Sequence, residues 1–152
     1  MAAHGVSRST LDIDLLVTDA SCLDGAVWEA LAREGVPLTV RRGDAEDPLA
    51  GVVRLGGAPE ASVDLVVGRF PWQAHVVERA VESSLEGVRV PVARAADLIL
   101  LKLYAGGPQD AWDVEQLLAG PARATLVAEV EAALGALPED ARRLWARIAA
   151  AR

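Results

Sequence analysis

The sequence predicts a mixed α/β fold, in which an α+β core with a mixed sheet is followed by a C-terminal helical bundle. Short segments of alternating apolar and polar residues, separated by turns such as residues 56–59, occur up to residue 93. From Arg94 onward, apolar residues recur at helical spacing. The length of 152 residues, with 52% hydrophobic residues, fits one compact domain. We therefore expect residues 1–93 to form the α/β core and residues 94–152 a helical extension, as one cooperative unit.

Periodicity assigns the elements of the core in chain order. Residues 10–18 predict a strand, because three apolar residues alternate there with Asp12 and Asp14. Residues 21–35 predict a helix, because a serine at the start can cap it and a glycine at the end can terminate it. A second helix is expected at residues 71–83. The remaining strands are expected at residues 36–42, 49–55, 61–67 and 87–92.

The C-terminal region predicts four helices. The first spans residues 95–105 and closes at a Gly-Gly pair. Pro108 then opens the next helix, because proline is tolerated in a first helical turn. The other three helices are expected at residues 109–118, 122–134 and 139–151.

The composition excludes several classes of protein. A net charge of -7 argues against a broad nucleic-acid-binding surface, because phosphate contacts need clustered Lys and Arg. No apolar run approaches the roughly 18 residues of a membrane helix, and no secretory signal follows Met1. Cys22 is the only cysteine, which prevents an internal disulfide and fits a reducing compartment. We therefore expect a cytoplasmic protein without a membrane partner.

Two aspartates on the first strand indicate a cation site. Side chains two residues apart on a strand point the same way, so Asp12 and Asp14 share one face. Their mutual repulsion is relieved when a cation lies between them. Mg²⁺ suits this role, because it takes one or two protein carboxylates and completes its shell with water and substrate phosphate. Asp64, on another apolar strand, supplies a third carboxylate. The alternative is that all three lie at strand ends and face water.

Lys102 is a second candidate site residue. It is the only lysine among fifteen basic residues and lies in an otherwise apolar helical run. Its compact ammonium suits a phosphate contact. The alternative is a stem that lies along the surface with its ammonium in water.

These residues occur in three stretches that resemble the polymerase-β-like nucleotidyltransferases, especially the bacterial group that includes abortive-infection toxins of the AbiEii type. The first stretch is similar to that family's Arg-x-Thr-x-Asp-x-Asp strand, and the third to its Asp-Leu helix with a Lys-Leu pair, followed by Asp-x-x-Asp. Together they span most of the chain. The stretches are residues 4–17, 63–66 and 97–113.

The resemblance implies a role for each matching residue. Asp12 and Asp14 would hold Mg²⁺ or Mn²⁺ against the nucleoside triphosphate, and Asp64 would be the third metal ligand or the base toward the acceptor. Lys102 would contact the nucleotide or its phosphates. Asp110 would lie near the nucleotide with Asp113, although an acidic residue in a first helical turn is also favoured by the helix dipole. The expected phosphate-binding residues before the strand are Ser7, Arg8, Ser9 and Thr10.

One departure from the family concerns the start of the core. The family's preceding strand and its Gly-Gly or Gly-Ser turn have no counterpart here, so we expect an N-terminally short core. The chain could begin further upstream, be naturally shortened, or be completed by another subunit. A second copy could also cover the sheet edge that such an absence exposes.

The expected activity is Mg²⁺-dependent transfer of a nucleoside monophosphate from ATP or another NTP to a hydroxyl. RNA such as a tRNA end, a protein or a small molecule could be the acceptor. The toxin resemblance implies a bacterial toxin-antitoxin component with an antitoxin as partner. Two alternatives are a shortened, inactive domain that binds a nucleotide or a protein, and a structural domain with surface aspartates.

Overall fold

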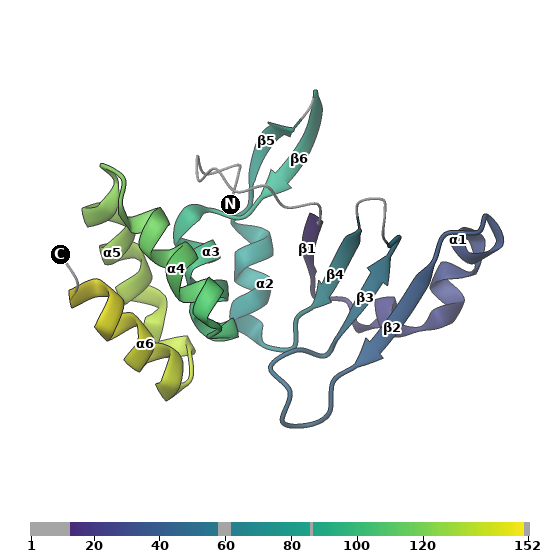
Figure 1. The fold of residues 1–152 in the computed structure, drawn as a ribbon, viewed down its shortest axis with the longest axis horizontal. Helices are drawn as coiled ribbons and strands as arrows, with labels where there is room; N and C mark the ends of the chain where they lie inside the picture. Colours follow the sequence, from purple (N-terminus) through teal and green to yellow (C-terminus); the bar gives the residue numbers. More distant parts are fainter. Residues whose placement is uncertain (1–12, 58–61, 86, 151–152) are drawn as a thin grey trace. The chain divides into compact units, whose positions relative to one another are not determined.

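The computed structural model describes residues 13–57, 62–85 and 87–150. It shows a mixed α+β chain that divides into two compact units (Figure 1). We call Ser9–Glu78 the sheet unit and Arg79–Arg152 the helical unit. The expected end of the α/β core lies fifteen residues after this division, because a strand hairpin opens the helical unit. Unfolding of the whole chain as one cooperative unit stays a prediction.

The sheet unit contains a four-stranded mixed sheet with the order β1-β4-β3-β2. β1 runs parallel to β4, whereas β3 is antiparallel to both β4 and β2. All four strands lie inside segments that the sequence predicts to be strands. Their bounds are β1 Ile13–Val17, β2 Leu38–Arg42, β3 Gly51–Leu55 and β4 Val63–Val67.

The single helix predicted for residues 21–35 is wrong. The segment forms two short 3-10 helices and a five-residue α-helix: η2 Ala20–Leu23, η3 Gly25–Trp28 and α1 Glu29–Arg33. The Asp24 side chain accepts a hydrogen bond from the N–H of Ala26 and so starts a new turn in mid-segment. Such local side-chain bonds compete with a continuous helix. Gly35, with φ of 82°, ends the segment as predicted.

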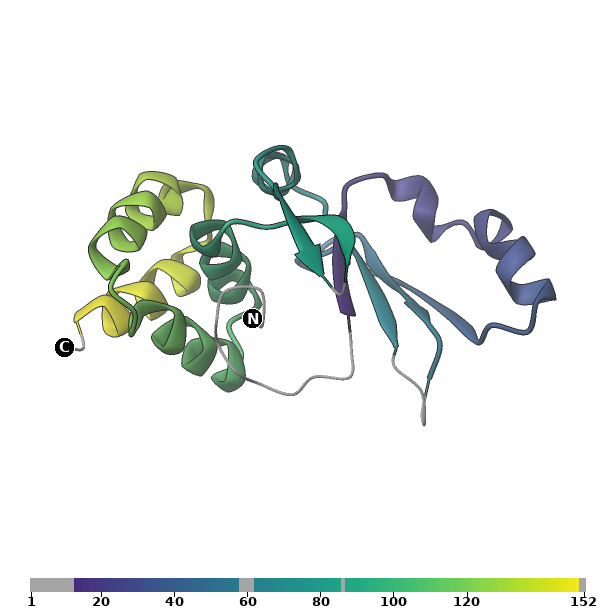
Figure 2. The same cartoon turned by 90° about the horizontal axis from the view of Figure 1, so that it is seen from above.

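This segment covers one face of the sheet (Figure 2). Leu23 packs with Val53, Leu65 and Val67 in the buried core of the unit. Leu23 can pack this closely because Gly51, on β3 beneath it, has no side chain. A Cβ at Gly51 would lie 2.6 Å from a Leu23 methyl and 2.4 Å from a backbone oxygen. The burial of these apolar side chains fixes which sheet face turns toward the core.

The helix predicted for residues 71–83 ends earlier than expected. α2 spans Pro71–Glu78, and β5, Val81–Leu85, follows it and pairs with β6, Val88–Val92. The antiparallel pairing aligns Val81 with Val92, so cross-strand partners override the helical spacing. The start of α2 is held by the buried Gln73, whose Oε1 accepts hydrogen bonds from the N–H groups of Arg69 and Phe70.

The helices of the C-terminal region match their predicted positions closely. α3 ends at Gly106, which has φ of 70°, and α4 begins at Pro108, as the sequence predicts. These helices pack against one another (Figure 1), and Ile99, Val114 and Trp145 are among their buried residues. No helix of the described part of the chain is long and apolar enough to cross a membrane. The helices are α3 Ala95–Ala105, α4 Pro108–Leu118, α5 Arg123–Ala133 and α6 Glu139–Ala150, with η4 Leu134–Ala136 before α6.

Candidate functional site

Asp14 and Asp64 are direct neighbours across the β1–β4 pair. The parallel register aligns Asp14 with Asp64, and residues aligned in this way point to the same face of a sheet. Adjacent strands lie about 4.8 Å apart, so two carboxylates project side by side from neighbouring backbones. Because Leu65 and Val67 turn to the core, these carboxylates belong to the opposite face. The structure therefore brings together two of the three carboxylates that the sequence singles out.

A row of polar residues continues from this pair across the sheet. The β3–β4 register aligns Arg54 with Asp64, and the β2–β3 register aligns Thr39 with Arg54. Arg41 lies two residues beyond Thr39 on the same face. The row is therefore acidic at β1 and β4 and basic at β3, and Arg41 adds a basic residue beside it on β2. From one sheet edge to the other it consists of Asp14, Asp64, Arg54 and Thr39.

Arg54 holds Asp64 with both arms of its guanidinium. Nε donates to Oδ1 at 2.7 Å and Nη2 donates to Oδ2 at 2.5 Å. These hydrogen bonds lower the pKa of the Asp64 carboxyl below its usual value, against partial burial that acts in the opposite direction. The positive charges of Arg54 and Arg41 add to the lowering. Asp64 is therefore an ionised acceptor at neutral pH.

The donor set of this pair fits a small divalent cation. Mg²⁺ binds oxygen ligands and needs only one or two protein carboxylates, which Asp14 and Asp64 provide from adjacent strands. In this structure the guanidinium of Arg54 is the positive charge that pairs with Asp64. Within residues 13–57, 62–85 and 87–150, no group of three or more His, Cys, Asp or Glu side chains is arranged to hold a metal ion. The described residues thus bring two carboxylates side by side, those of Asp14 and Asp64.

Several predicted site residues lie outside the described residues, so their placement stays a prediction. Asp12, the third expected metal ligand, is one of them. The others are the expected phosphate-binding residues Ser7, Arg8, Ser9 and Thr10.

Lys102 lies in the helical unit, where it joins α3 to α4. Its ammonium lies 2.8 Å from Oδ2 of Asp113 and 2.9 Å from Oδ1 of Asp110. Asp113 is fully buried, and Gln109 donates a further hydrogen bond to it. Asp110 also accepts a hydrogen bond from the N–H of Gly107, which caps α4. These contacts give Lys102, Asp110 and Asp113 a role in packing the two helices, and their predicted role at the nucleotide stays a prediction.

The surroundings of Lys102 favour its charged form. Burial by itself disfavours the ammonium, but hydrogen bonds to Asp113 and Asp110 outweigh it, so the pKa of Lys102 lies above its ordinary value. A charged lysine can be kept in this partly buried position only because both carboxylates are present.

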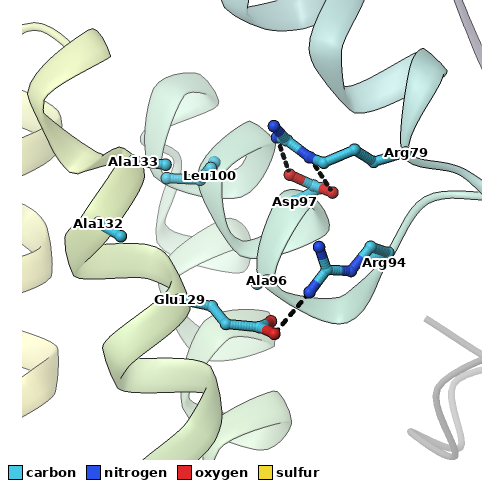
Figure 3. Close-up of a pocket in the computed structure, with 8 residues that line it drawn as sticks. All are labelled: Arg79, Arg94, Ala96, Asp97, Leu100, Glu129, Ala132 and Ala133. Atoms are coloured by element: carbon cyan, nitrogen blue, oxygen red, sulfur yellow. Dashed lines mark hydrogen bonds and ion pairs between the residues drawn. The ribbon is translucent and has the colours of Figure 1, made fainter.

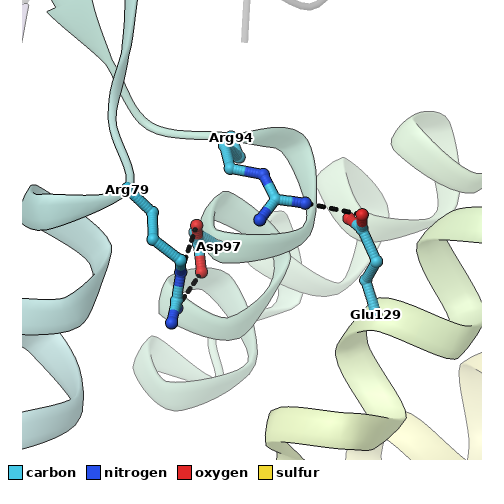
Figure 4. Close-up of polar contacts among 4 residues, drawn as sticks. All are labelled: Arg79, Arg94, Asp97 and Glu129. Atoms are coloured by element: carbon cyan, nitrogen blue, oxygen red, sulfur yellow. Dashed lines mark hydrogen bonds and ion pairs between the residues drawn. The ribbon is translucent and has the colours of Figure 1, made fainter.

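The helical unit also contains a pocket of about 320 Å³ (Figure 3). Arg79 points to Asp97 and Arg94 points to Glu129, with one closest N–O distance of 2.5 Å in each pair (Figure 4). Apolar side chains such as Leu100 complete the lining. Each lining guanidinium thus pairs with a lining carboxylate, which balances the local charge. None of the expected site residues that the structure describes lines this pocket.

Arg54 is the residue of the carboxylate site that sequence reasoning missed. Its signal was an arginine inside the otherwise apolar strand Gly51–Leu55, within a hairpin whose partner strand has an aspartate. A charge pair across a hairpin can be assigned only when the register is known. The sequence that connects these strands has no pattern that fixes the register.

Comparison with known proteins leaves the site to be interpreted from its own chemistry. No protein-family model matches the chain, and no curated protein sequence is significantly similar to it.

Proposed function

We propose that this protein is a Mg²⁺-dependent nucleotidyltransferase, which moves a nucleoside monophosphate from an NTP to a hydroxyl acceptor and releases pyrophosphate. The observation that supports this most strongly is the alignment of Asp14 with Asp64 on one face of a mixed sheet. Asp12 precedes Asp14 by two residues, as in the nucleotidyltransferase strand that the sequence resembles. The sheet unit then corresponds to a nucleotidyltransferase core.

In this proposal the carboxylates of Asp12, Asp14 and Asp64 would hold Mg²⁺, and the metal would supply positive charge to the triphosphate and to the reacting oxygens. The acceptor oxygen forms a bond to the α-phosphorus, the bond to the β-phosphate bridge breaks, and the acceptor proton passes to a base. We assign Asp64 as a metal ligand and not as that base, because it projects beside Asp14 from the neighbouring strand. The residues thus act by positioning and by charge.

The partners follow from the same proposal. The NTP is the donor, and RNA, a protein or a small molecule is the acceptor. The toxin resemblance adds a bacterial cytoplasmic setting and an antitoxin partner. A homodimer would cover the edge strand β1, where Ile13 and Leu15 are about half exposed.

The direct test is incorporation of α-labelled NTPs in the presence of Mg²⁺, with RNA and protein acceptors. We compare the wild type with Asp14→Asn and Asp64→Asn, and use Asp140→Asn as a control that removes the same charge from an exposed position on α6. The two site variants should lose at least about 100-fold in rate, and the control should keep the wild-type rate. Equal incorporation by all four proteins would contradict the proposal, as would no incorporation by the wild type with any nucleotide and acceptor.

A second candidate function is nucleotide binding without turnover. The bidentate Arg54–Asp64 pair favours it, because both oxygens of Asp64 are already engaged. In that case a non-hydrolysable NTP would bind to the protein and raise its melting temperature, while no labelled nucleotide would be transferred.

A further inference from the structure

The bidentate pair creates a conflict at the proposed metal site. A carboxylate whose two oxygens each accept a hydrogen bond from Arg54 must release at least one of them to ligate a metal. The guanidinium and a divalent cation also repel each other at this distance. Arg54 and Mg²⁺ therefore compete for Asp64.

The two partners differ in how firmly they are held in place. The Asp64 side chain is 15% exposed and lies on a central strand, whereas the Arg54 side chain is 55% exposed. The long arginine stem can swing into solvent, while the short aspartate is fixed by its strand. When a cation arrives at Asp64, Arg54 is the group that moves.

The released guanidinium has a suitable partner near the same site. Its planar fork binds phosphate with two parallel hydrogen bonds, as it binds the carboxylate. A triphosphate held by a metal on Asp14 and Asp64 would lie one strand away from the Arg54 backbone. Arg41 adds positive charge on the same face.

We propose that Arg54 is the internal counter-ion of Asp64 in the metal-free protein and exchanges this carboxylate for the substrate triphosphate when the divalent cation binds. This inference rests on the proposed function, because it takes the metal and the triphosphate from it. Arg54 thus couples the two binding events, since metal binding frees the group that holds the phosphates.

The first experiment measures binding of Mn²⁺ alone, as free Mn²⁺ by electron paramagnetic resonance, to the wild type and to Arg54→Gln. Arg33→Gln is the matched control, because it removes an arginine from an exposed ion pair of the same unit. Arg54→Gln should bind Mn²⁺ roughly two- to fivefold more tightly than the wild type, since a competing ion pair is lost. At saturating Mn²⁺ it should bind a non-hydrolysable NTP about tenfold more weakly. Arg33→Gln should match the wild type in both measurements.

The second experiment follows the wild type, and a conservative variant serves only to assign its signal. The Nε–H signal of Arg54, assigned by its absence from Arg54→Lys, is followed by ¹⁵N nuclear magnetic resonance during a Mg²⁺ titration. The chemical shift of this signal should change as Mg²⁺ binds and Arg54 releases Asp64. It should change again when the NTP analogue is added. A signal that stays fixed through both additions would overturn the exchange.

The outcomes separate this inference from the proposed function. Equal Mn²⁺ affinity in Arg54→Gln and Arg33→Gln overturns the inference, and leaves the proposed function standing if the wild type transfers nucleotides. Tighter Mn²⁺ binding and weaker NTP binding without any transfer support the inference and contradict the activity. Absence of Mn²⁺ binding to all three proteins contradicts both.

Discussion

Asp64 has an acidic neighbour on one side and a basic neighbour on the other, and this position decides its chemistry. Asp14 on β1 is aligned with Asp64 and would be the second carboxylate of the proposed metal site. Arg54 across β3 keeps Asp64 ionised and stabilises the pair while no metal is present. One residue on a central strand therefore belongs to both an ion pair and a candidate metal site.

At the same scale, Lys102 is expected to stabilise the helical unit. Replacing it in Lys102→Met leaves the fully buried Asp113 without its cation, which should lower the free energy of unfolding by about 3 kcal/mol. Urea denaturation at neutral pH measures this loss. A change below about 0.5 kcal/mol would mean that the ion pair contributes nothing to the packing of α3 on α4.

The pH dependence of this contribution follows from the raised pKa of Lys102. When folding raises the pKa of a lysine, the resulting stabilisation is fully present below the ordinary pKa of about 10.4. It is lost as the pH rises through the higher pKa of the folded state. The difference in unfolding free energy between the wild type and Lys102→Met should therefore stay constant from pH 7 to 9 and shrink above about pH 10.5. A difference that already shrinks between pH 7 and 9 would show that the pKa is not raised.

At the scale of elements, the sheet unit depends on the segment that covers its core face. η2 places Leu23 against Gly51, and Trp28 in η3 donates its indole N–H to the Cys22 carbonyl at 2.7 Å. Arg42 on β2 donates to the Leu23 carbonyl at 2.6 Å. These contacts attach η2 and η3 to the sheet, although neither would be stable as an isolated helix.

Gly51→Ala should weaken this attachment. The added methyl would meet the backbone oxygen of Arg41 and a Leu23 methyl, so we expect a loss of about 1 to 3 kcal/mol in the free energy of unfolding. Gly25→Ala is the matched control, because a Cβ at that position meets nothing within 4 Å. Thermal or urea unfolding of both variants decides the matter, and equal stabilities would show that the approach of Leu23 is looser than the structure has it.

Elements whose signals are local were predictable from the sequence. α3 and α4 match their expected bounds because Gly106 and Pro108 set a stop and a start independently of the rest of the fold. The expected helix at 21–35 failed because Asp24 makes a local turn that apolar spacing does not reveal. Residues 81–85 were missed because their partner strand decides their conformation.

The same distinction between local and long-range signals applies to the candidate site. Spacing alone placed Asp14 and Asp64 on strands, but their alignment depends on the order β1-β4-β3-β2 and on the register. Arg54 enters the site through the antiparallel register of β3 with β4, which no local signal encodes. A site whose residues come from different strands can be recognised only when the strand order and register are known.

At the scale of the whole molecule, ligand binding should act through the sheet unit. A non-hydrolysable NTP with Mg²⁺ at 100-fold its dissociation constant should add about 2.7 kcal/mol to the free energy of unfolding. In hydrogen exchange, the amides of β1 and β4 should become slower, because Asp14 and Asp64 become metal ligands. Asp14→Asn should abolish both effects, and unchanged exchange in these strands would place any bound nucleotide elsewhere.

The proposed function depends on one claim, that Asp14 and Asp64 share one divalent cation. A crystal grown with Mn²⁺ and a non-hydrolysable NTP tests it directly through anomalous scattering. We expect a Mn²⁺ peak between the two carboxylates, about 2.1 Å from an oxygen of each and adjacent to the triphosphate. A nucleotide-bound crystal with no peak there, and with Asp64 still held by both arms of Arg54, would contradict the claim.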